Sequence, residues 1–98
     1  MNVAHERTTR FLRDWNKLAI PEQERFAVAV RRFAEDLMHG RPPRPGLRVK
    51  PVQAAPGIFE ITFAPDGRAT WEYGQPQHQG ETRIIWRRIG GHGIFANP

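Results

Sequence analysis

The sequence predicts an α+β domain in which two helices near the N-terminus pack on one face of a twisted antiparallel sheet. Two observations carry this prediction. Apolar residues recur at helical spacing up to residue 37, and from residue 47 they alternate with polar residues as they do on strands. With 98 residues the chain has the length of one domain, which we assign to residues 1–98.

The helical part consists of two segments, Thr9–Leu18 and Pro21–His39, after a short edge strand at residues 3–6. Proline is favoured in the first turn of a helix, where its missing amide costs no hydrogen bond, and glycine is favoured just after the end. Pro21 and Gly40 fit these positions. The second helix shows one apolar stripe, formed by Phe26, Val30, Phe33 and Leu37.

Four strands follow a proline-rich connector at residues 41–46, and Asp66-Gly67 between two of them is typical of a tight hairpin turn. The strands are predicted at Leu47–Val52, Ile58–Phe63, Arg68–Tyr73 and Thr82–Ile89. The last of them carries a nearly continuous apolar run, which favours an interior position in the sheet. A final short strand is predicted at Ile94–Phe95.

Alternation along the strands separates a core face from an open face. The core face is predicted to carry Leu47, Val49, Phe59, Ile61, Phe63, Ala69, Trp71 and Tyr73. The open face is predicted to carry Arg48, Lys50, Glu60, Thr62, Arg68, Thr70 and Glu72. The open face therefore collects cations around one central carboxylate, Glu60.

The charge balance indicates an anionic partner. Lys and Arg total 15 against 10 Asp and Glu, which gives a net charge of +5, so nucleic acid, an acidic protein or an anionic membrane is favoured. The chain has no cysteine, which excludes disulfides and thiolate metal sites. The longest apolar run, Phe26–Val30, is too short for a bilayer, and the N-terminus lacks the apolar core of a signal peptide. We expect a cytoplasmic protein.

The order of short strand, helical hairpin and strand meander resembles the RelE/ParE superfamily of toxins from type II toxin–antitoxin systems, and its RelE/HigB-like branch in particular. The resemblance is carried by residues 11–18, 46–51, 57–60, 66–68 and 89–95. It implies a RelE-like fold and silencing by a cognate antitoxin protein. It further implies one of two activities: cleavage of mRNA on the ribosome, or, in the ParE branch, action on DNA gyrase.

Metal-free cleavage of RNA needs a base for the 2′-OH proton, cations for the charge that builds on the phosphate, and an acid for the leaving 5′-oxygen. Lys50 and Glu60 are the candidate bases. The resemblance implies that Arg68, just after the hairpin turn, stabilises the phosphate. It also makes His92 the candidate acid. No cofactor is expected, and the spacing of the histidines matches no metal motif.

Further residues are candidates for RNA contact. The resemblance assigns Arg48 to phosphate, and Arg87 or Arg88 could provide a second cation. Because side chains alternate between the faces of a strand, only one of these two can lie on the open face. Arg87 is favoured, because Arg88 would point to the same face as Trp86. Many members carry a tyrosine near the C-terminus that stacks on a base or transfers a proton; here the nearest residue is Phe95, which can only stack.

Three functions from different classes remain open at this point. The first is a ribosome-dependent endoribonuclease toxin, favoured by Glu60 and His92 together. The second is a non-catalytic toxin that acts on DNA gyrase, favoured by the missing tyrosine. The third is a module that binds RNA or a partner protein and kept the fold without the toxicity.

Overall fold

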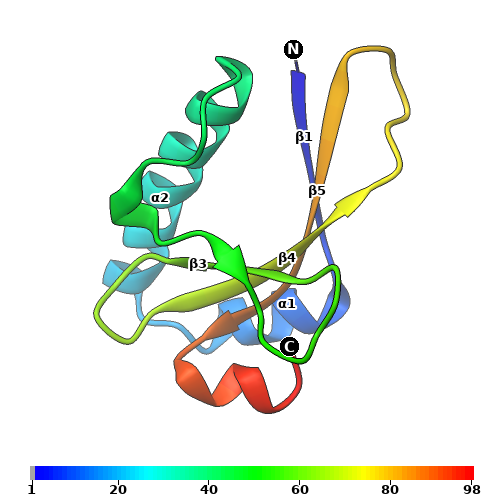
Figure 1. The fold of residues 1–98 in the computed structure, drawn as a ribbon. Coiled ribbons are helices and arrows are strands. Elements are labelled where there is room, and N and C mark those ends of the chain that lie inside the picture. The colour runs from blue at the N-terminus through cyan, green and yellow to red at the C-terminus, as the bar shows by residue number, and fades with distance from the viewer. Residues whose placement is uncertain (1) are drawn as a thin grey trace.

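The computed structural model describes residues 2–98 and shows an α+β fold with helices packed on a mixed five-stranded sheet (Figure 1). Its elements are β1 (Asn2–Arg7), α1 (Thr9–Asn16), α2 (Ile20–Met38), the 3₁₀ turn η1 (Pro45–Leu47), β2 (Lys50–Pro51), β3 (Phe59–Thr62), β4 (Arg68–Gly74), β5 (Glu81–Gly90) and the 3₁₀ helix η2 (His92–Ala96). The strand order is β1-β5-β4-β3-β2. Among residues 2–98, no helix has the length and apolarity that crossing a membrane requires.

Local sequence signals explain where the helices begin and end. Thr8 precedes α1 and its hydroxyl oxygen accepts a hydrogen bond from the amide of Phe11 at 3.0 Å. Pro21 lies in the first turn of α2, as predicted. Gly40 follows the C-cap of α2 with φ of +66°, the left-handed conformation that glycine adopts without a steric penalty.

The core lies between α2 and the inner face of the sheet. Phe33 is fully buried, and its ring centroid lies 5.0 Å from that of Trp71 on β4. Phe26 packs edge-on against Trp86 of β5 at 5.2 Å. The apolar stripe of α2 thus faces the apolar side of the strands, which confirms the predicted core.

The sheet is mixed, so the prediction of an antiparallel sheet was wrong in one respect. β1 pairs with β5 in parallel, whereas the other neighbouring strands are antiparallel. The connection from β1 to β5 runs through both helices and through β2, β3 and β4. β5 lies between β1 and β4, so its predicted interior position is confirmed.

The strand predicted at Leu47–Val52 is reduced to Lys50–Pro51. Pro45 opens the 3₁₀ turn η1, and Arg48 follows in the left-handed conformation with φ of +49°. A left-handed residue breaks the extended backbone, so the alternation that placed Arg48 on the open face does not apply. The predicted strand at Ile94–Phe95 was also wrong, because this segment belongs to η2.

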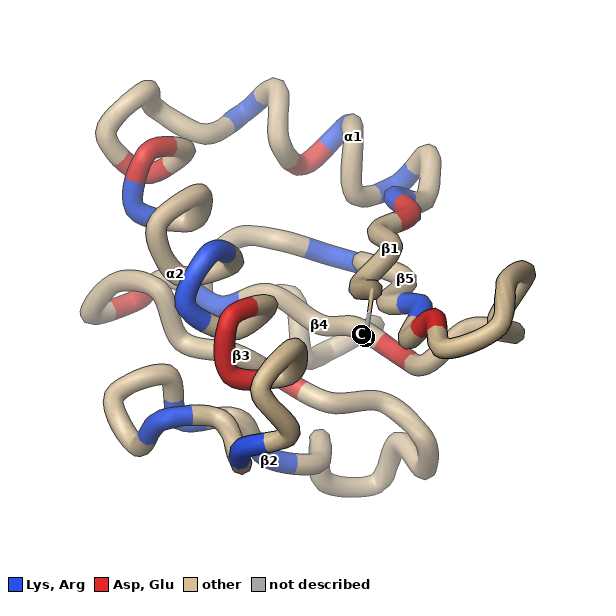
Figure 2. Tube along the Cα trace, turned by 90° about the horizontal axis from the view of Figure 1, so that it is seen from above, with Lys and Arg blue, Asp and Glu red and all other residues tan. Residues whose placement is uncertain are grey.

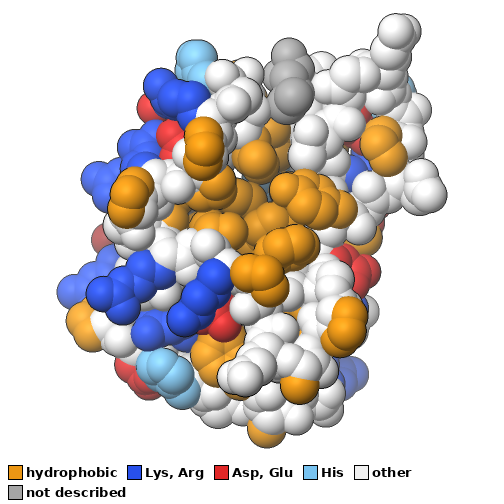
Figure 3. All heavy atoms as spheres, viewed as in Figure 1, with side chains coloured by type: hydrophobic (Ala, Val, Ile, Leu, Met, Phe, Trp, Pro, Cys, Tyr) orange, Lys and Arg blue, Asp and Glu red, His pale blue; other side chains and the backbone are white. Residues whose placement is uncertain are grey.

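The core face extends beyond the part of the sheet that the helices cover. Tyr73 was predicted on this face, and its ring does contact Phe59 with centroids 5.8 Å apart, but its side chain is 55% exposed. Viewed as in Figure 1, apolar side chains form an area at the centre of the molecule, and Lys and Arg gather along its α2 side (Figure 3).

Candidate functional site

The strand register places a row of polar side chains across the outer face of the sheet. Lys50 pairs with Glu60, Glu60 with Thr70, and Thr70 with Arg88. The Nζ atom of Lys50 lies 4.0 Å from Oε1 of Glu60. The two candidate bases therefore lie together, as the predicted open face requires.

Exposure separates the two candidate bases. The side chain of Lys50 is 67% exposed, which leaves its ammonium group hydrated, whereas a catalytic lysine base needs desolvation. The side chain of Glu60 is only 12% exposed. Glu60 is therefore the better candidate for a base, and Lys50 the better candidate for a contact to phosphate.

His92 is oriented by a carboxylate from the β3–β4 turn. Its Nδ1 atom lies 2.5 Å from Oδ1 of Asp66, and its main-chain amide donates to the same oxygen. The hydrogen bond from His92 lowers the pKa of the Asp66 carboxyl below its usual range. Because Nδ1 of His92 is bonded to Asp66, the other ring nitrogen of His92 is available to a bound substrate. The His92 ring also packs edge-on against Phe95, with centroids 5.9 Å apart.

Gly91 leaves room for the Asp66 carboxylate beside His92. A Cβ atom at position 91 would lie 2.5 Å from Oδ2 of Asp66, so a side chain there would force that carboxylate to move. Asp66 was interpreted from the sequence only as a turn residue, and its partnership with His92 was missed. An aspartate directly before the glycine of a hairpin turn is common, so nothing in the sequence indicated a second role for Asp66.

Arg68 is fixed at the start of β4. Its Nη1 atom donates to the main-chain oxygens of Ala64, Pro65 and Gly67, at 3.2, 3.4 and 2.9 Å. These bonds use one of its three guanidinium nitrogens. The charge is thus held in place at the turn that also carries Asp66, while the remaining donors are left for an anion.

Arg87 and Arg88 both reach the outer face, so the prediction that only one could do so was wrong. The register of β4 and β5 shifts between Thr70 and Trp71: Thr70 pairs with Arg88, but Trp71 pairs with Trp86. Such a bulge sets two residues opposite one and cancels the alternation argument. Arg87 bonds Glu72 at 2.9 Å, whereas the Nε atom of Arg88 bonds Asp14 at 2.7 Å.

The end of the described chain covers part of the outer face. The main-chain oxygen of Pro98 accepts hydrogen bonds from Oγ1 of Thr70 at 3.0 Å and from Nε of Arg87 at 3.2 Å. Arg88 donates to the oxygen of Asn97 at 3.1 Å. Thr70 is consequently buried, and Arg87 and Arg88 are occupied. The accessible part of the predicted site is the half near β2, β3 and the turn.

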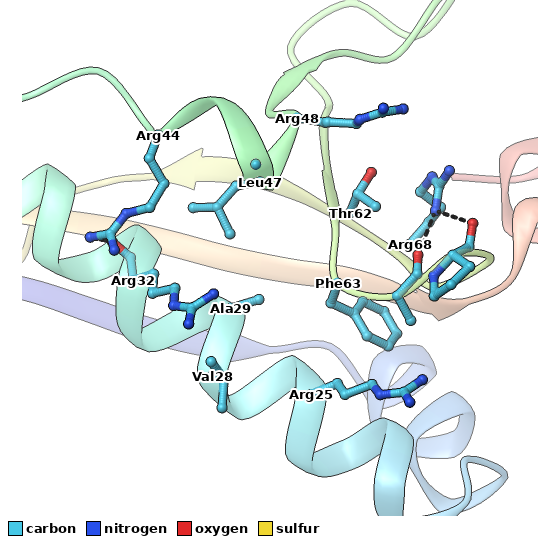
Figure 4. A pocket seen from close by; sticks show the side chains of 13 residues that line it. Arg25, Val28, Ala29, Arg32, Arg44, Leu47, Arg48, Thr62, Phe63 and Arg68 are labelled. Atoms are coloured by element: carbon cyan, nitrogen blue, oxygen red, sulfur yellow. Dashed lines mark hydrogen bonds between the residues drawn. The ribbon is translucent and has the colours of Figure 1, made fainter.

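Arg48 and Arg68 line a cavity of about 700 Å³ between α2, η1 and the end of β3. Three further arginines line it: Arg25 and Arg32 from α2 and Arg44 from the connector (Figure 4). Viewed from above, Lys and Arg lie on α1, α2, β2 and β5 (Figure 2). No sequence pattern indicated this grouping, because a pair such as Arg31-Arg32 is typical of a solvated helix face.

Comparison with known proteins identifies the fold. No protein-family model matches the sequence, and no curated protein matches it. The structure is similar to the RelB–RelE antitoxin–toxin complex from Methanococcus jannaschii, at 13% identity and a TM-score of 0.62, over 94% of this chain and 95% of that chain. For the DinJ–YafQ toxin–antitoxin complex of E. coli, the identity is 11% and the TM-score 0.61, over 96% and 97%.

A third similar structure is the YoeB/ParE toxin from Agrobacterium tumefaciens, at 14% identity and a TM-score of 0.55, over 94% of this chain and 99% of that chain. The three likenesses each span nearly the full length of both chains. They confirm the RelE-like fold that the order of elements predicted. The chain has the fold of the RelE, YafQ and YoeB/ParE toxins.

Proposed function

We propose that the protein is the toxin of a type II toxin–antitoxin system and that it inhibits translation as a metal-independent endoribonuclease. It cuts mRNA on the ribosome, in the cytoplasm, and a cognate antitoxin silences it. The toxin role is supported by the fold, since the similar structures are described as toxins and toxin–antitoxin complexes. The nuclease role is supported by one observation in particular, the His92–Asp66 pair next to Arg68.

Together the three groups offer a proton donor and a cation, which general acid catalysis on a phosphate needs. Asp66 fixes the orientation of the His92 ring through Nδ1, so the other ring nitrogen faces outward, where it can exchange a proton with the substrate. Arg68 holds a positive charge at the same turn. A fixed cation beside a developing anion stabilises the transition state because it needs no reorganisation.

The proposed step is an in-line transfer within the RNA chain. Glu60 takes the 2′-OH proton, the 2′-oxygen forms a bond to phosphorus, and the bond from phosphorus to the 5′-oxygen breaks. His92 gives its proton to that leaving oxygen, and Arg68 balances the charge on the phosphate. Arg48 and Lys50 hold the neighbouring phosphates, and Phe95 stacks on a base. His92 thus does the proton transfer for which Phe95 lacks a hydroxyl.

The proposal is tested by induced expression in cells, followed by mapping of transcript ends. The wild-type protein is expected to arrest growth and to produce new 5′ ends within translated regions. Arg68→Ala should relieve the arrest, because its loss lowers the cleavage rate by about 10²–10³. Arg13→Ala, which removes an exposed arginine of α1, is the matched control and should remain toxic.

Two other results would contradict the nuclease and favour the alternatives. Growth arrest with intact transcripts would indicate a non-catalytic toxin of the gyrase type. Normal growth with intact transcripts, at the same level of folded protein, would indicate a module that binds RNA or a partner.

A further inference from the structure

A contact between β1 and β5 has no part in the proposed chemistry. His5 lies on β1, the outer strand of the sheet, and Trp86 lies on β5 beside it. The Nε1 atom of Trp86 donates a hydrogen bond to Nδ1 of His5 at 3.1 Å. The two rings lie nearly parallel, with 10° between their planes and their centroids 6.3 Å apart. Because the indole is only 2% exposed, the contact joins the edge of the sheet to the core.

This hydrogen bond fixes the protonation state of His5. An indole nitrogen can only donate, so Nδ1 of His5 must accept, and the proton of the neutral ring lies on Nε2. A protonated imidazole carries an N–H group on both nitrogens and would place one of them against the indole N–H. Protonation therefore breaks the bond and leaves a buried donor of Trp86 without a partner, which costs free energy.

Within residues 2–98, no neighbouring charge favours the protonated ring. Partial burial, followed by the positive charge of Arg7, lowers the pKa of His5 below its ordinary value of 6.5. The adjacent carboxylate of Glu6 pairs with Arg83 at 3.0 Å, and neighbouring side chains of a strand point to opposite faces. Ile84, which pairs with His5 in the sheet, carries no charge. Among the described residues, no charged group of α1 or of α2, which packs along β1, shifts this pKa.

Few other contacts hold β1 to the fold. It lies at the edge of the sheet and pairs with β5 alone (Figure 1). In the part of the chain that the structure describes, Val3 is the only side chain of β1 that packs against the buried core, and the last three residues of the strand, His5 among them, are exposed. A strand with so little apolar contact belongs to the least stable part of a fold, which opens without global unfolding.

The contact lies where β1, β5 and α1 meet. Thr8 follows β1 and precedes α1, and its amide donates to the main-chain oxygen of Trp86 at 3.0 Å. Its hydroxyl donates to the main-chain oxygen of Arg87 at 2.9 Å. Both bonds reach the segment of β5 that carries the indole. Loss of the imidazole contact therefore weakens the junction through which β1 enters α1.

We propose that His5 makes β1 a pH-sensitive strand. The neutral imidazole fastens β1 to β5 through Trp86, and the protonated imidazole releases β1 and uncovers the indole and the edge of β5. β1 lies at the opposite edge of the sheet from β2, so the Lys50–Glu60 pair stays in place when β1 opens. The device goes beyond the proposed function, because it controls the fold at the edge far from the proposed chemistry.

The direction of the pH effect follows from the lowered pKa of His5. A base whose pKa is lower in the folded state than in the unfolded state binds fewer protons when folded. The stabilisation of β1 is therefore complete above pH 6.5, and it is lost as the pH falls from there to the folded pKa. Acidification opens β1, and neutralisation closes it.

The test is an NMR titration of the full chain from about pH 8 to about pH 5, the range in which histidine titrates, without RNA or a partner. It follows the ring of His5, the indole N–H of Trp86 and the exchange protection of the amides of β1 and Thr8. In the wild type all three are expected to change with one midpoint below pH 6.5. The protection should fall roughly tenfold, as one unpaired buried donor predicts, while that of the β3 amides changes little.

Two variants separate His5 from a general effect of acid. His5→Gln keeps a side-chain oxygen that can accept from the indole but does not titrate, so the protection of β1 should be the same at both ends of the titration. His39→Gln, at the exposed end of α2, is the matched control and should keep the wild-type pH dependence.

Two results would overturn the proposal. One is a loss of β1 protection in His5→Gln equal to that in the wild type. The other is a wild-type His5 ring that titrates while the indole signal of Trp86 stays unchanged. The second result needs no variant, so the proposal stays open to refutation even where a variant fails to fold. No cleavage is measured, so the outcome does not depend on whether the protein is a nuclease.

Discussion

Two aspartates in this fold hold basic side chains in opposite ways. Asp36 on α2 is 3% exposed and receives hydrogen bonds from the main-chain amide and the guanidinium of Arg44, and a further one from Arg41. Asp66 has a side chain that is 77% exposed and, within residues 2–98, bonds only His92. A carboxylate whose partner is held entirely inside the fold fixes structure, whereas one that leaves its partner a free ring nitrogen orients that nitrogen for chemistry.

The role of Asp36 is to fasten the proline-rich connector to α2. The hydrogen bonds from the side chain and the amide of Arg44 lower the pKa of Asp36 to about 2, and Asp36 in turn raises the pKa of Arg44. The connector leads directly into η1 and then into β2. This clamp therefore sets the position of Arg48 and Lys50 without touching a substrate.

The largest expected effect concerns the exposed pair. His92→Gln should lower the rate of mRNA cleavage by about 10²–10⁴, because it removes the group that protonates the leaving oxygen. His39→Gln, at the exposed end of α2, serves as the control and should keep the wild-type rate. A rate for His92→Gln equal to that of the wild type would remove His92 from the mechanism.

The second prediction asks whether packing, rather than the Asp36 clamp, carries the stability of α2. Phe33→Ala should lower the free energy of unfolding by about 3–5 kcal/mol, because a fully buried ring leaves a cavity. Ile20→Ala, at a side chain that is 69% exposed, should change it by about 0.5 kcal/mol or less. Urea unfolding followed by tryptophan fluorescence measures both, and a small loss for Phe33→Ala would contradict the core assignment.

The third prediction uses the lowered pKa of Asp36. Its folded pKa of about 2 lies below the ordinary value of 3.8, so its contribution to stability is complete above pH 3.8 and is lost as the pH falls towards 2. The melting temperature of Asp36→Asn should therefore lie below that of the wild type at pH 7, and the difference should close just below pH 2. Glu24→Gln, at an exposed position of α2, should show little difference at either pH.

The smallest expected effect is in the titration of Asp66. NMR of the carboxyl carbons should give Asp66 a pKa below 3.8 in the wild type. In His92→Gln this pKa should rise towards 3.8, since the imidazole hydrogen bond is the main cause of the shift. An unchanged titration would mean that the two side chains do not interact in solution.

Most of the fold could be predicted because local signals and global packing agree. α2 forms where its apolar stripe, Pro21 and Gly40 predict a helix. β3 and β4 form where apolar and polar residues alternate. Arg48 is an exception because its left-handed conformation has no sequence signal in a non-glycine residue. The segment Ile94–Phe95 is another, since two apolar residues are too few to distinguish a strand from a 3₁₀ turn.

The candidate site could be predicted only in part. Lys50 and Glu60 lie together because their strands keep the expected register. The bulge beside Thr70 moves Arg88 to the outer face, and Pro98 covers the region around Thr70. Both features depend on contacts between segments that are distant in the sequence, so local patterns do not predict them. The Asp66–His92 pair likewise joins residues 26 positions apart, so only the folded chain brings it together.

The most direct test of the account is a single-turnover assay of mRNA cleavage on programmed ribosomes, run together with thermal melts. The wild type is expected to cut the message. Asp66→Asn should slow cleavage by a factor on the order of 10² with its melting temperature kept, because the histidine loses its orienting carboxylate. Asp36→Asn should melt earlier and slow cleavage less than Asp66→Asn does, because it disturbs only the position of the phosphate contacts Arg48 and Lys50. An intact message with the wild-type protein, or full cleavage by Asp66→Asn, would contradict the account.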